Sequence, residues 1–262
     1  MPVADKRVRQ LRDEIRAGRV TGLTTGMAAG HVQCNLVVLP AARAADFETF
    51  CRTNASACPL LGMSQPGDAA LPALGDGIDV RTDLPGYRVC IEGQTPLEVS
   101  DIRSYWRDDA VAFAIGCWFS MEQALLTAGV RLRHVEQGIQ GPLFKTTLPA
   151  TPSGHFSGPL VVSMRPFAPD EVERVRAVTA RFPRVHGAPL HMGAADALGI
   201  RDLKQPDYGE PIEMETDAVP VFWGCGLTAL AALERADLPW YITHAPGKML
   251  VTDLLNASLE ER

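Results

Sequence analysis

The sequence of this 262-residue chain predicts an α/β fold in which a larger unit is interrupted by a smaller α+β unit. Residues 138–195 read as strand, strand, helix and strand, an order typical of a small two-layer α+β sandwich. The segments on both sides share a different pattern, an apolar strand followed by a Gly-Cys turn and a helix. Hydrophobic residues make up 46% of the chain, which is ample for a core. We therefore expect a larger discontinuous unit, 1–137 with 196–262, around a smaller one at 138–195.

Local patterns predict the elements of the larger unit. Val8, Leu11 and Ile15 recur at helical spacing, so residues 4–17 predict an amphipathic helix closed by Gly18. The glycine-rich loop at 21–30 carries neither GxGxxG nor GK[ST], and we interpret it as a flexible loop near the site rather than a phosphate cradle. The further expected elements are a buried strand at 31–39 stopped by Pro40, a helix at 43–54, a turn-rich stretch at 58–77, a strand near 86–91 and a short helix or turn near 101–109.

The smaller unit is predicted from three apolar runs and one helical pattern. The runs PLFKTTLPA, GPLVVSMRPF and RVHGAPLHMG predict three strands, and a helix at 169–181 is expected between the second and the third. From residue 219 the pattern of the larger unit returns.

Composition limits the classes of partner. The formal charge is −6 and no block of Lys or Arg occurs, which argues against nucleic acid or an anionic membrane as the main partner. No apolar run approaches the ~18 residues of a membrane span, and the N-terminus lacks the apolar stretch of a signal peptide. We expect a cytoplasmic protein with a small-molecule partner, and a homo-oligomer stays open. The six cysteines form no CxxC pair, so a zinc ribbon is unsupported.

A sequence pattern, which we call the internal echo, occurs twice in the predicted larger unit. AFAIGCWFSMEQALL (112–126) and PVFWGCGLTALAALE (220–234) both read as apolar strand, Gly-Cys, two residues, a hydroxyl and a helix. Ser120 and Thr228 are expected to cap these helices. A further strand is expected to follow each helix and to end at His134 and at His244. Internal duplication and chance similarity both remain open.

The echo places Cys117 and Cys225 at two helix N-termini. Free N–H groups and the helix dipole favour an anion there, which lowers the pKa of a thiol and lets it act as base or nucleophile. The same amides can dock a substrate carboxylate. We expect the two thiols to converge on one shared hollow. The alternative is that both are small buried hydrophobes.

Histidines supply the other candidates for proton transfer. His186 and His191 are five residues apart on a strand that Gly187 and Pro189 are expected to bend, and three roles stay open: catalysis or substrate binding, metal ligation with a further ligand, or bonding to the backbone. His244, in THAPGK, is expected to line a cleft as base or stabilising cation. Asp253 either orients His244 or caps a terminal turn.

Polar residues near these elements complete the candidate set. Arg165 at a strand end suits a substrate carboxylate or a structural ion pair. Glu122 either complements a helix dipole or acts as acid or base. Asn35 lies within an apolar strand, and its side-chain amide needs hydrogen-bond partners if it is buried. We expect Asn35 to bind substrate, and we expect the same of Ser120, Thr228 and Lys248.

Eight segments carry a resemblance to a known family: HVQCNLVVLP, CPLLGMSQPGD, DVRTDLPGYRV, WRDDAVAFAIGCWFSME, GPLVVSMRPF, RFPRVHGAPLHMG, VPVFWGCG and THAPGKMLVTDL. Over residues 8–255 the chain resembles the DUF1445 family, whose members are labelled hydro-lyases, and is similar to one module of mitochondrial D-glutamate cyclase. The resemblance implies a larger three-layer α/β/α unit with a smaller two-layer sandwich. Lys248, His31 and Cys34 depart from the family pattern, which commonly has His, an aromatic residue and Ala there.

The function we expect is a lyase that needs no cofactor and acts on a small amino or hydroxy acid carboxylate. What the resemblance implies is loss of water from D-glutamate to give 5-oxo-D-proline. Two alternatives stay open. One is a non-catalytic protein that binds a small carboxylate. The other is a hydratase that uses a divalent metal held by His186, His191 and a carboxylate.

Overall fold

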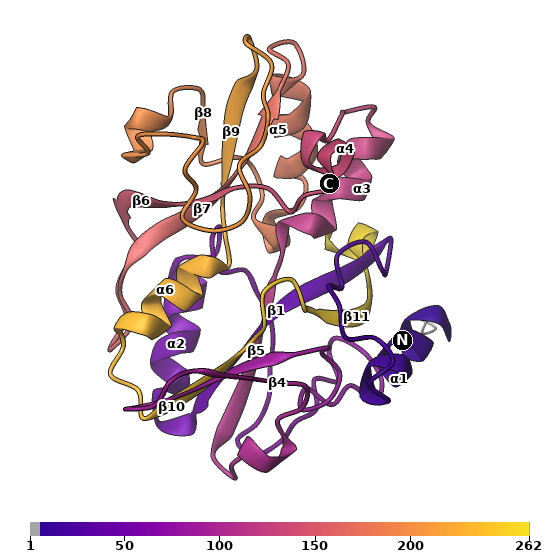
Figure 1. Cartoon of the computed structure of the whole chain (residues 1–262), viewed down its shortest axis with the longest axis vertical. Helices are drawn as coiled ribbons and strands as arrows, with labels where there is room; N and C mark the ends of the chain where they lie inside the picture. The colour runs from indigo at the N-terminus through magenta and orange to yellow at the C-terminus, as the bar shows by residue number, and fades with distance from the viewer. Residues whose placement is uncertain (1–5, 262) are drawn as a thin grey trace. The chain divides into compact units, whose positions relative to one another are not determined.

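The computed structural model describes residues 6–261 and contains two antiparallel sheets with helices (Figure 1), which confirms the α/β class. The chain forms two compact units. Unit 1 comprises the described residues up to Thr49, with Leu60–Ser120 and Asp237–Ser258. Unit 2 comprises Phe50–Pro59, Met121–Ala236 and the described residues from Leu259 on.

Unit 1 is built on a seven-stranded sheet. Its strands are β2 (Leu60–Met63), β5 (Ala110–Gly116), β1 (His31–Pro40), β10 (Trp240–His244), β3 (Tyr87–Ile91) and β4 (Leu97–Val99) in spatial order, with β11 (Leu250–Leu255) on the first half of β1. The pairing sets Leu36 opposite Ala114 on β5 and Val37 opposite Thr243 on β10. The run HVQCNLVVLP forms the central strand, since every residue of it except Asn35 is buried.

Two helices accompany this sheet. α1 (Lys6–Arg16) confirms the helix expected at 4–17, of which residues 4 and 5 lie outside the described residues. It packs Val8 against Val251 of β11. α2 (Ala41–Thr53) begins in unit 1, where Phe47 meets Phe113 of β5 edge-on with ring centroids 4.9 Å apart.

A buried cation fastens α1 to the sheet. Arg12 is 1% exposed, and its Nη1 lies 2.7 Å from Oδ1 of Asp253 and donates to the carbonyl of Val251. Asp83, also buried, lies 3.8 Å from Nε of Arg12. Since two buried carboxylates face this guanidinium, its charge is neutralised inside unit 1.

Unit 2 is built on a four-stranded sheet in the order β6 (Leu143–Pro149), β7 (Pro159–Phe167), β9 (Val219–Gly224) and β8 (His191–Met192). Its helices are α3 (Glu122–Thr127), α4 (Arg133–Gln137), α5 (Val172–Ala180) and α6 (Leu227–Arg235). Short 3₁₀ turns occur in both units: η1 (Arg103–Tyr105), η2 (Trp118–Met121), η3 (Pro183–Val185), η4 (Ala195–Leu198) and η5 (Asn256–Leu259).

The expected strand, strand, helix, strand order occurs as β6, β7, α5 and β8. However, β9 lies between β7 and β8 in the sheet, so β9 and α6 belong to unit 2. The unit therefore extends well beyond 138–195 on both sides. Local patterns do not show this, because the pairing of β9 with β7 joins residues more than fifty positions apart.

Two predicted strands are wrong. The segment expected as a strand ending at His134 is the helix α4, which Gly138 closes in a left-handed conformation at φ 67°. The segment RVHGAPLHMG is mostly irregular: His186 ends the turn η3 at φ 100°, and only His191 and Met192 pair in β8. Across the described residues, no helix is both long and apolar enough to cross a membrane.

Candidate functional site

Some of the predicted site residues lie in two groups of ionisable side chains. The predicted residues Glu122, Arg165 and Cys225 interact in unit 2 with His134, and we call these four the unit 2 cluster. In unit 1, Cys117 acts on Cys34 of β1, and His244 lies on the neighbouring strand β10; we call these three the unit 1 cluster. The expectation that Cys117 and Cys225 share one hollow stays a prediction.

Cys225 stands at the N-terminus of α6. Its own N–H donates to the carbonyl of Val161 at 2.9 Å, which fixes the turn after β9, and its thiol accepts from the N–H of Leu227. Burial raises the pKa of Cys225 to about 11, against the opposing influence of the Leu227 amide and of Arg165. The expected depressed pKa is therefore wrong for Cys225. At neutral pH the thiol keeps its proton and can donate it.

Arg165 is a buried cation on β7. Its Nη1 donates to the carbonyl of Met164 at 2.8 Å and its Nη2 to the carbonyl of Gln140 at 2.7 Å. Gly141 has φ 88°, and a Cβ there would stand 2.7 Å from Nη1, so only glycine leaves room for the guanidinium. The charge of Arg165 lowers the pKa of both Cys225 and His134. This guanidinium thus sets the electrostatics of the cluster.

His134 and Glu122 form a hydrogen-bonded pair. Nε2 of His134 lies 2.6 Å from Oε1 of Glu122. Burial, followed by the charge of Arg165, lowers the pKa of His134, while the bond to Glu122 opposes the shift. The imidazole is therefore neutral at pH 7. In the hydrogen bond to Glu122 the ring proton sits on Nε2, and Nδ1 is in the form that accepts a proton.

Thr228 has a different role from the expected one. The position that begins α6 is Gly226, and no side chain caps it. Instead Oγ1 of Thr228 accepts from the N–H of Val161 at 2.9 Å and fastens α6 to β7. The predicted cap is wrong, because the hydroxyl of Thr228 bonds to the backbone of β7 rather than to its own helix.

Two further cysteines lie beside Cys225. The thiol of Cys58 is hydrogen-bonded to that of Cys51, and both cysteines are free. This hydrogen bond, burial and the charges of Cys51 and Cys225 raise the pKa of Cys58 well above its usual range. The N–H of Ala229 in α6 donates to Cys58. Sequence reasoning missed both thiols and undervalued His134, since no spacing in the chain relates residues 51–58 to the second Gly-Cys turn.

Cys117 occupies a different turn. β5 ends at Gly116, and the chain then forms η2, in which the N–H of Ser120 donates to the carbonyl of Cys117 at 3.0 Å. The six-residue α3 begins only at Glu122, and no side chain caps it. The predictions of a helix N-terminus at Cys117 and of a Ser120 cap are wrong. The hydroxyl of Ser120 has no hydrogen-bond partner in the part of the chain that the structure describes.

Cys34 faces the same end of β5. It is buried on β1 opposite Gly116. Burial, and then the charge of Cys117, raise the pKa of Cys34 far above the usual range of a thiol. The departure from the family pattern at this position therefore brings a second, inert thiol next to Cys117.

His244 ends β10 as a neutral donor. The N–H of Leu36 donates to Nδ1 of His244 at 3.3 Å. Burial lowers the pKa of His244 to about 4, so the ring is uncharged at pH 7 and its proton sits on Nε2. This state does not fit the role of stabilising cation, and the role of base stays a prediction. Asp253 does not orient His244, because it is committed to Arg12.

The remaining candidates of unit 1 bind backbone or pack. Nδ2 of Asn35 donates to the carbonyls of Ile115 and Gly116 at 3.4 and 3.3 Å. Lys248 lies across Gly86, where a Cβ would stand 2.8 Å from Cδ of the lysine. The substrate-binding roles of Asn35 and Lys248 stay predictions.

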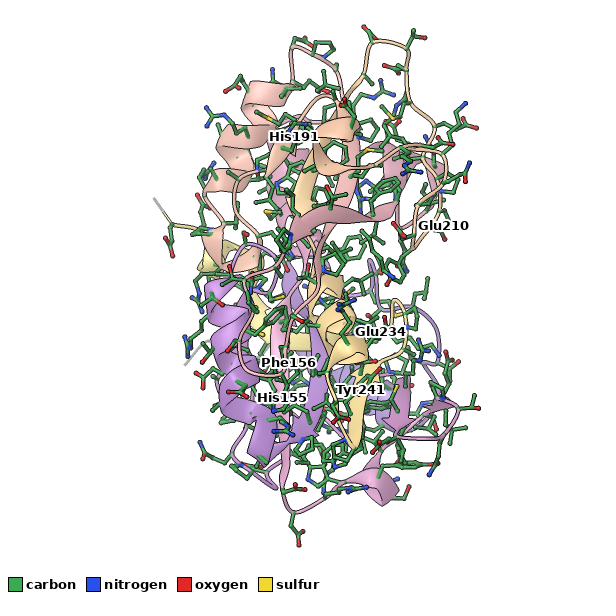
Figure 2. All side chains as sticks on the ribbon, turned by 90° about the vertical axis from the view of Figure 1, so that its left-hand side faces the viewer. His155, Phe156, His191, Glu210, Glu234 and Tyr241 are labelled. Carbon is green, nitrogen blue, oxygen red and sulfur yellow. The ribbon has the colours of Figure 1, made fainter. Side chains whose placement is uncertain are left out.

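His186 and His191 both bind backbone carbonyls. Nδ1 of His186 lies 2.9 Å from the oxygen of Ser56, and Nε2 of His191 (Figure 2) lies 2.7 Å from the oxygen of Ala194. No group of three or more His, Cys, Asp or Glu side chains within residues 6–261 is arranged to hold a metal ion. Of the three roles left open for these histidines, the structure therefore supports backbone bonding.

A polar hollow of about 520 Å³ lies in unit 1 beside α1. Arg16, Arg81 and Arg103 line it with Asp79 and Asp101. Arg81 is bonded to both oxygens of Asp79, and Arg103 to Asp101. Because these cations are paired with carboxylates of the same wall, the hollow has little charge to offer an anion.

Comparison with known proteins defines the class. Residues 111–253 match the family described as D-glutamate cyclase. A Bordetella petrii protein named "Putative hydro-lyase" is 52% identical over 95% of this chain and 94% of its own length. A Bradyrhizobium protein with the same name is 49% identical over 95% and 92% of the two chains.

The chain therefore belongs to the D-glutamate cyclase family. The matched region contains both Gly-Cys turns and the whole unit 2 cluster. A solved structure, the nitrogen repressor-like protein of Methanococcus jannaschii, aligns over 94% of this chain and 98% of its own, with 10% identity and a TM-score of 0.37. That likeness is too distant to support an argument.

Proposed function

We propose that the protein is a hydro-lyase that acts on a small amino acid carboxylate, with D-glutamate as the first substrate to test, and that the unit 2 cluster is its reaction site. One observation carries the proposal: a neutral imidazole, held by Glu122, shares the field of a buried guanidinium with a protonated thiol at a helix N-terminus. Membership in the D-glutamate cyclase family supports the choice of substrate.

The proposed reaction closes D-glutamate to 5-oxo-D-proline. The amine attacks the side-chain carboxyl carbon, a C–N bond forms, and a C–O bond breaks. Both protons lost by the ammonium group end on the departing oxygen, which leaves as water. The reaction thus needs a base for the ammonium, a cation for the carboxylate and a donor for the leaving oxygen.

The cluster contains a group for each of these tasks. Neutral His134 takes a proton from the ammonium group, and Glu122 stabilises the imidazolium that results. Arg165 balances the substrate carboxylate. The thiol of Cys225 donates to the oxygen on which negative charge develops, and the N–H of Leu227 stabilises the sulfur from which the proton departs. We propose the reaction without a resident cofactor, and a chelator tests the metal-dependent alternative.

The test compares the half-buried Glu122 with a glutamate at the surface. Full-length protein is incubated with D-glutamate and with L-glutamate, and 5-oxoproline is separated by chiral chromatography. We expect Glu122→Gln and His134→Asn to lower turnover about 10²-fold, in the range of lost general acid–base catalysis. The matched control is Glu136→Gln in α4, whose carboxylate pairs with exposed Arg131 at the surface and should leave turnover unchanged.

Two results would contradict the proposal. Wild-type turnover in both Glu122→Gln and His134→Asn would remove the reaction from the unit 2 cluster. A raised melting temperature with D-glutamate, without product at any pH, would favour the non-catalytic binding protein.

A further inference from the structure

Ser163 has a buried hydroxyl for which the described part of the chain offers no hydrogen-bond partner. The residue is 2% exposed in the middle of β7, and its Oγ has no hydrogen-bond partner among residues 6–261. Its strand neighbours are Leu143 on β6 and Trp223 on β9, neither of which offers a side-chain acceptor facing it. Such a group needs an explanation, because buried polar groups are nearly always paired.

The other buried hydroxyls of unit 2 are paired. Thr146 donates to the carbonyl of Leu160 at 2.9 Å, and Thr179 donates to the carbonyl of Val175 at 3.0 Å. Thr228 accepts from Val161. Leaving a buried hydroxyl unpaired is costly, because the group gives up its hydrogen bonds to water without gaining another. The exception at Ser163 is therefore a local one and points to a partner that arrives with a ligand.

Ser163 lies between the two charged features of the unit 2 cluster. Side chains alternate along a strand, so Val161, Ser163 and Arg165 share one face of β7. Neighbours on that face are about 7 Å apart along the strand. The backbone N–H of Cys225 donates to the carbonyl of Val161, and α6 begins two residues after Cys225. The hydroxyl is thus flanked by the Arg165 position on one side and by the N-terminus of α6 on the other.

This setting selects the charge of the ligand. A guanidinium and the amides of a helix N-terminus both favour an anion and disfavour a cation. A hydroxyl in their midst serves best as a third donor. A carboxylate has two oxygens with several lone pairs and can accept from a hydroxyl and a cation at once.

We propose that Ser163 is a substrate-binding and specificity-determining residue, whose hydroxyl donates to the carboxylate that does not react, while Arg165 balances its charge. This inference rests on the proposed function for its site and deepens it. It assigns the ligand class as a small molecule with two carboxylates, one held by Ser163 and one presented to the amine or to its replacement.

The test separates a binding role from a structural one. In the full chain, Ser163→Ala should leave the melting temperature of the ligand-free protein unchanged or raise it, because an unpaired hydroxyl is removed. The KM for D-glutamate should rise about tenfold with kcat within about threefold, the loss expected for one hydrogen bond to a charged group. Ser163→Thr restores the hydroxyl and should recover most of the affinity.

The matched control is Thr146→Val on β6, which removes a paired hydroxyl. It should lower the melting temperature and leave KM unchanged. A lower melting temperature in ligand-free Ser163→Ala, or an unchanged KM, would overturn the inference.

Binding of glutarate, which has both carboxylates but no amine, keeps this test independent of turnover. Calorimetric affinity for glutarate should fall about tenfold in Ser163→Ala. If the wild-type protein turns over no D-glutamate but shows this loss, the proposed reaction fails and the inference stands. If turnover is intact and glutarate binds both proteins equally, or binds neither, the inference fails and the proposed reaction stands.

Discussion

The two Gly-Cys turns share a sequence pattern and differ in their surroundings. After Cys225 a nine-residue helix begins, its first N–H groups meet thiols, and Arg165 adds a positive charge. After Cys117 comes a 3₁₀ turn, and the neighbour that acts on Cys34 there is the thiol of Cys117 itself. The turn at Cys225 lies near a cation that stabilises negative charge. The turn at Cys117 lies near a second free thiol, that of Cys34 on β1.

The shared motif therefore determines the bend of the chain and not the chemistry of its cysteine. In both turns burial is the leading cause that raises a thiol pKa. What distinguishes them is a cation from β7, more than fifty residues away from Cys225 in the chain. The following experiments test whether the two turns differ in this way, beginning with the largest expected effect.

Removing the charge of Arg165 should make the surroundings of Cys225 resemble those of Cys117. We expect Arg165→Met to lower turnover of D-glutamate about 10³-fold, since it removes the charge that balances the substrate. Alkylation of Cys225 across a pH series should also become slower, because the cation that lowers its pKa is lost. The control is Arg107→Met, whose guanidinium stacks 4.9 Å above the ring of Trp240 in unit 1. Equal activity of the two variants would end the special role of Arg165.

Exchange of each thiol in turn compares the two turns directly. Cys225→Ser should lower turnover about 10²-fold, as expected for loss of a positioned donor, and Cys117→Ser should lower it only a few-fold. The measurement is kcat for D-glutamate, with circular dichroism to confirm folding. Equal losses in both variants would restore the symmetric pair of thiols that the sequence predicts.

Acid should act on the histidine of each cluster. The folded-state pKa of His244 is about 4, below its ordinary 6.5, so the folded protein binds fewer protons than the unfolded chain. This contribution to stability is present above pH 6.5 and is lost as the pH falls toward 4, on the order of 2–3 kcal/mol in all. The lowered pKa of His134 acts in the same direction.

Urea unfolding at a series of pH values measures this loss. In His244→Asn, whose amide oxygen can still accept from Leu36, the acid loss should be smaller, and in His134→Asn part of it should remain. A wild-type protein whose stability does not change between pH 7 and pH 4 would contradict the neutral state of both rings.

The smallest expected effect compares the two hydroxyls that follow the cysteines. Thr228→Val leaves the buried N–H of Val161 without its acceptor and should lower the free energy of unfolding by about 1–2 kcal/mol. Ser120→Ala removes a hydroxyl that has no partner within the described residues and should be neutral or slightly stabilising. Thermal unfolding measures both. A larger loss in Ser120→Ala than in Thr228→Val would reverse the assignment.

The sequence predicts what short-range patterns determine. Helical spacing around Val8 and Ile15 gives α1, and the apolar run after His31 gives β1. The alternating look of residues 130–136 misleads, because Gly138 and the bond between His134 and Glu122 favour a helix there. The membership of β9 in unit 2 depends on a pairing with β7 that no local pattern reveals.

The candidate residues are more predictable from the sequence than their protonation states. Of the residues that the sequence combines in one hypothetical site, the structure places Arg165 and Cys225 in the unit 2 cluster, with Glu122 and His134. The others lie elsewhere: Cys117, His186, His191 and His244. The signs of the thiol and imidazole shifts were not predictable, since they depend on how deeply tertiary packing buries each group. Ser163 gave no signal in the sequence, because an unpaired hydroxyl is visible only once its neighbours are known.

The pairing of β1 has a consequence for synthesis of the protein on the ribosome. β1 emerges early, yet it needs β10 and β11, which are translated some two hundred residues later. The sheet of unit 2 is complete once β9 has emerged. The unit that starts first is thus finished last. β5 can pair with one edge of β1 early, but the other edge stays without its partners until β10 and β11 have been made.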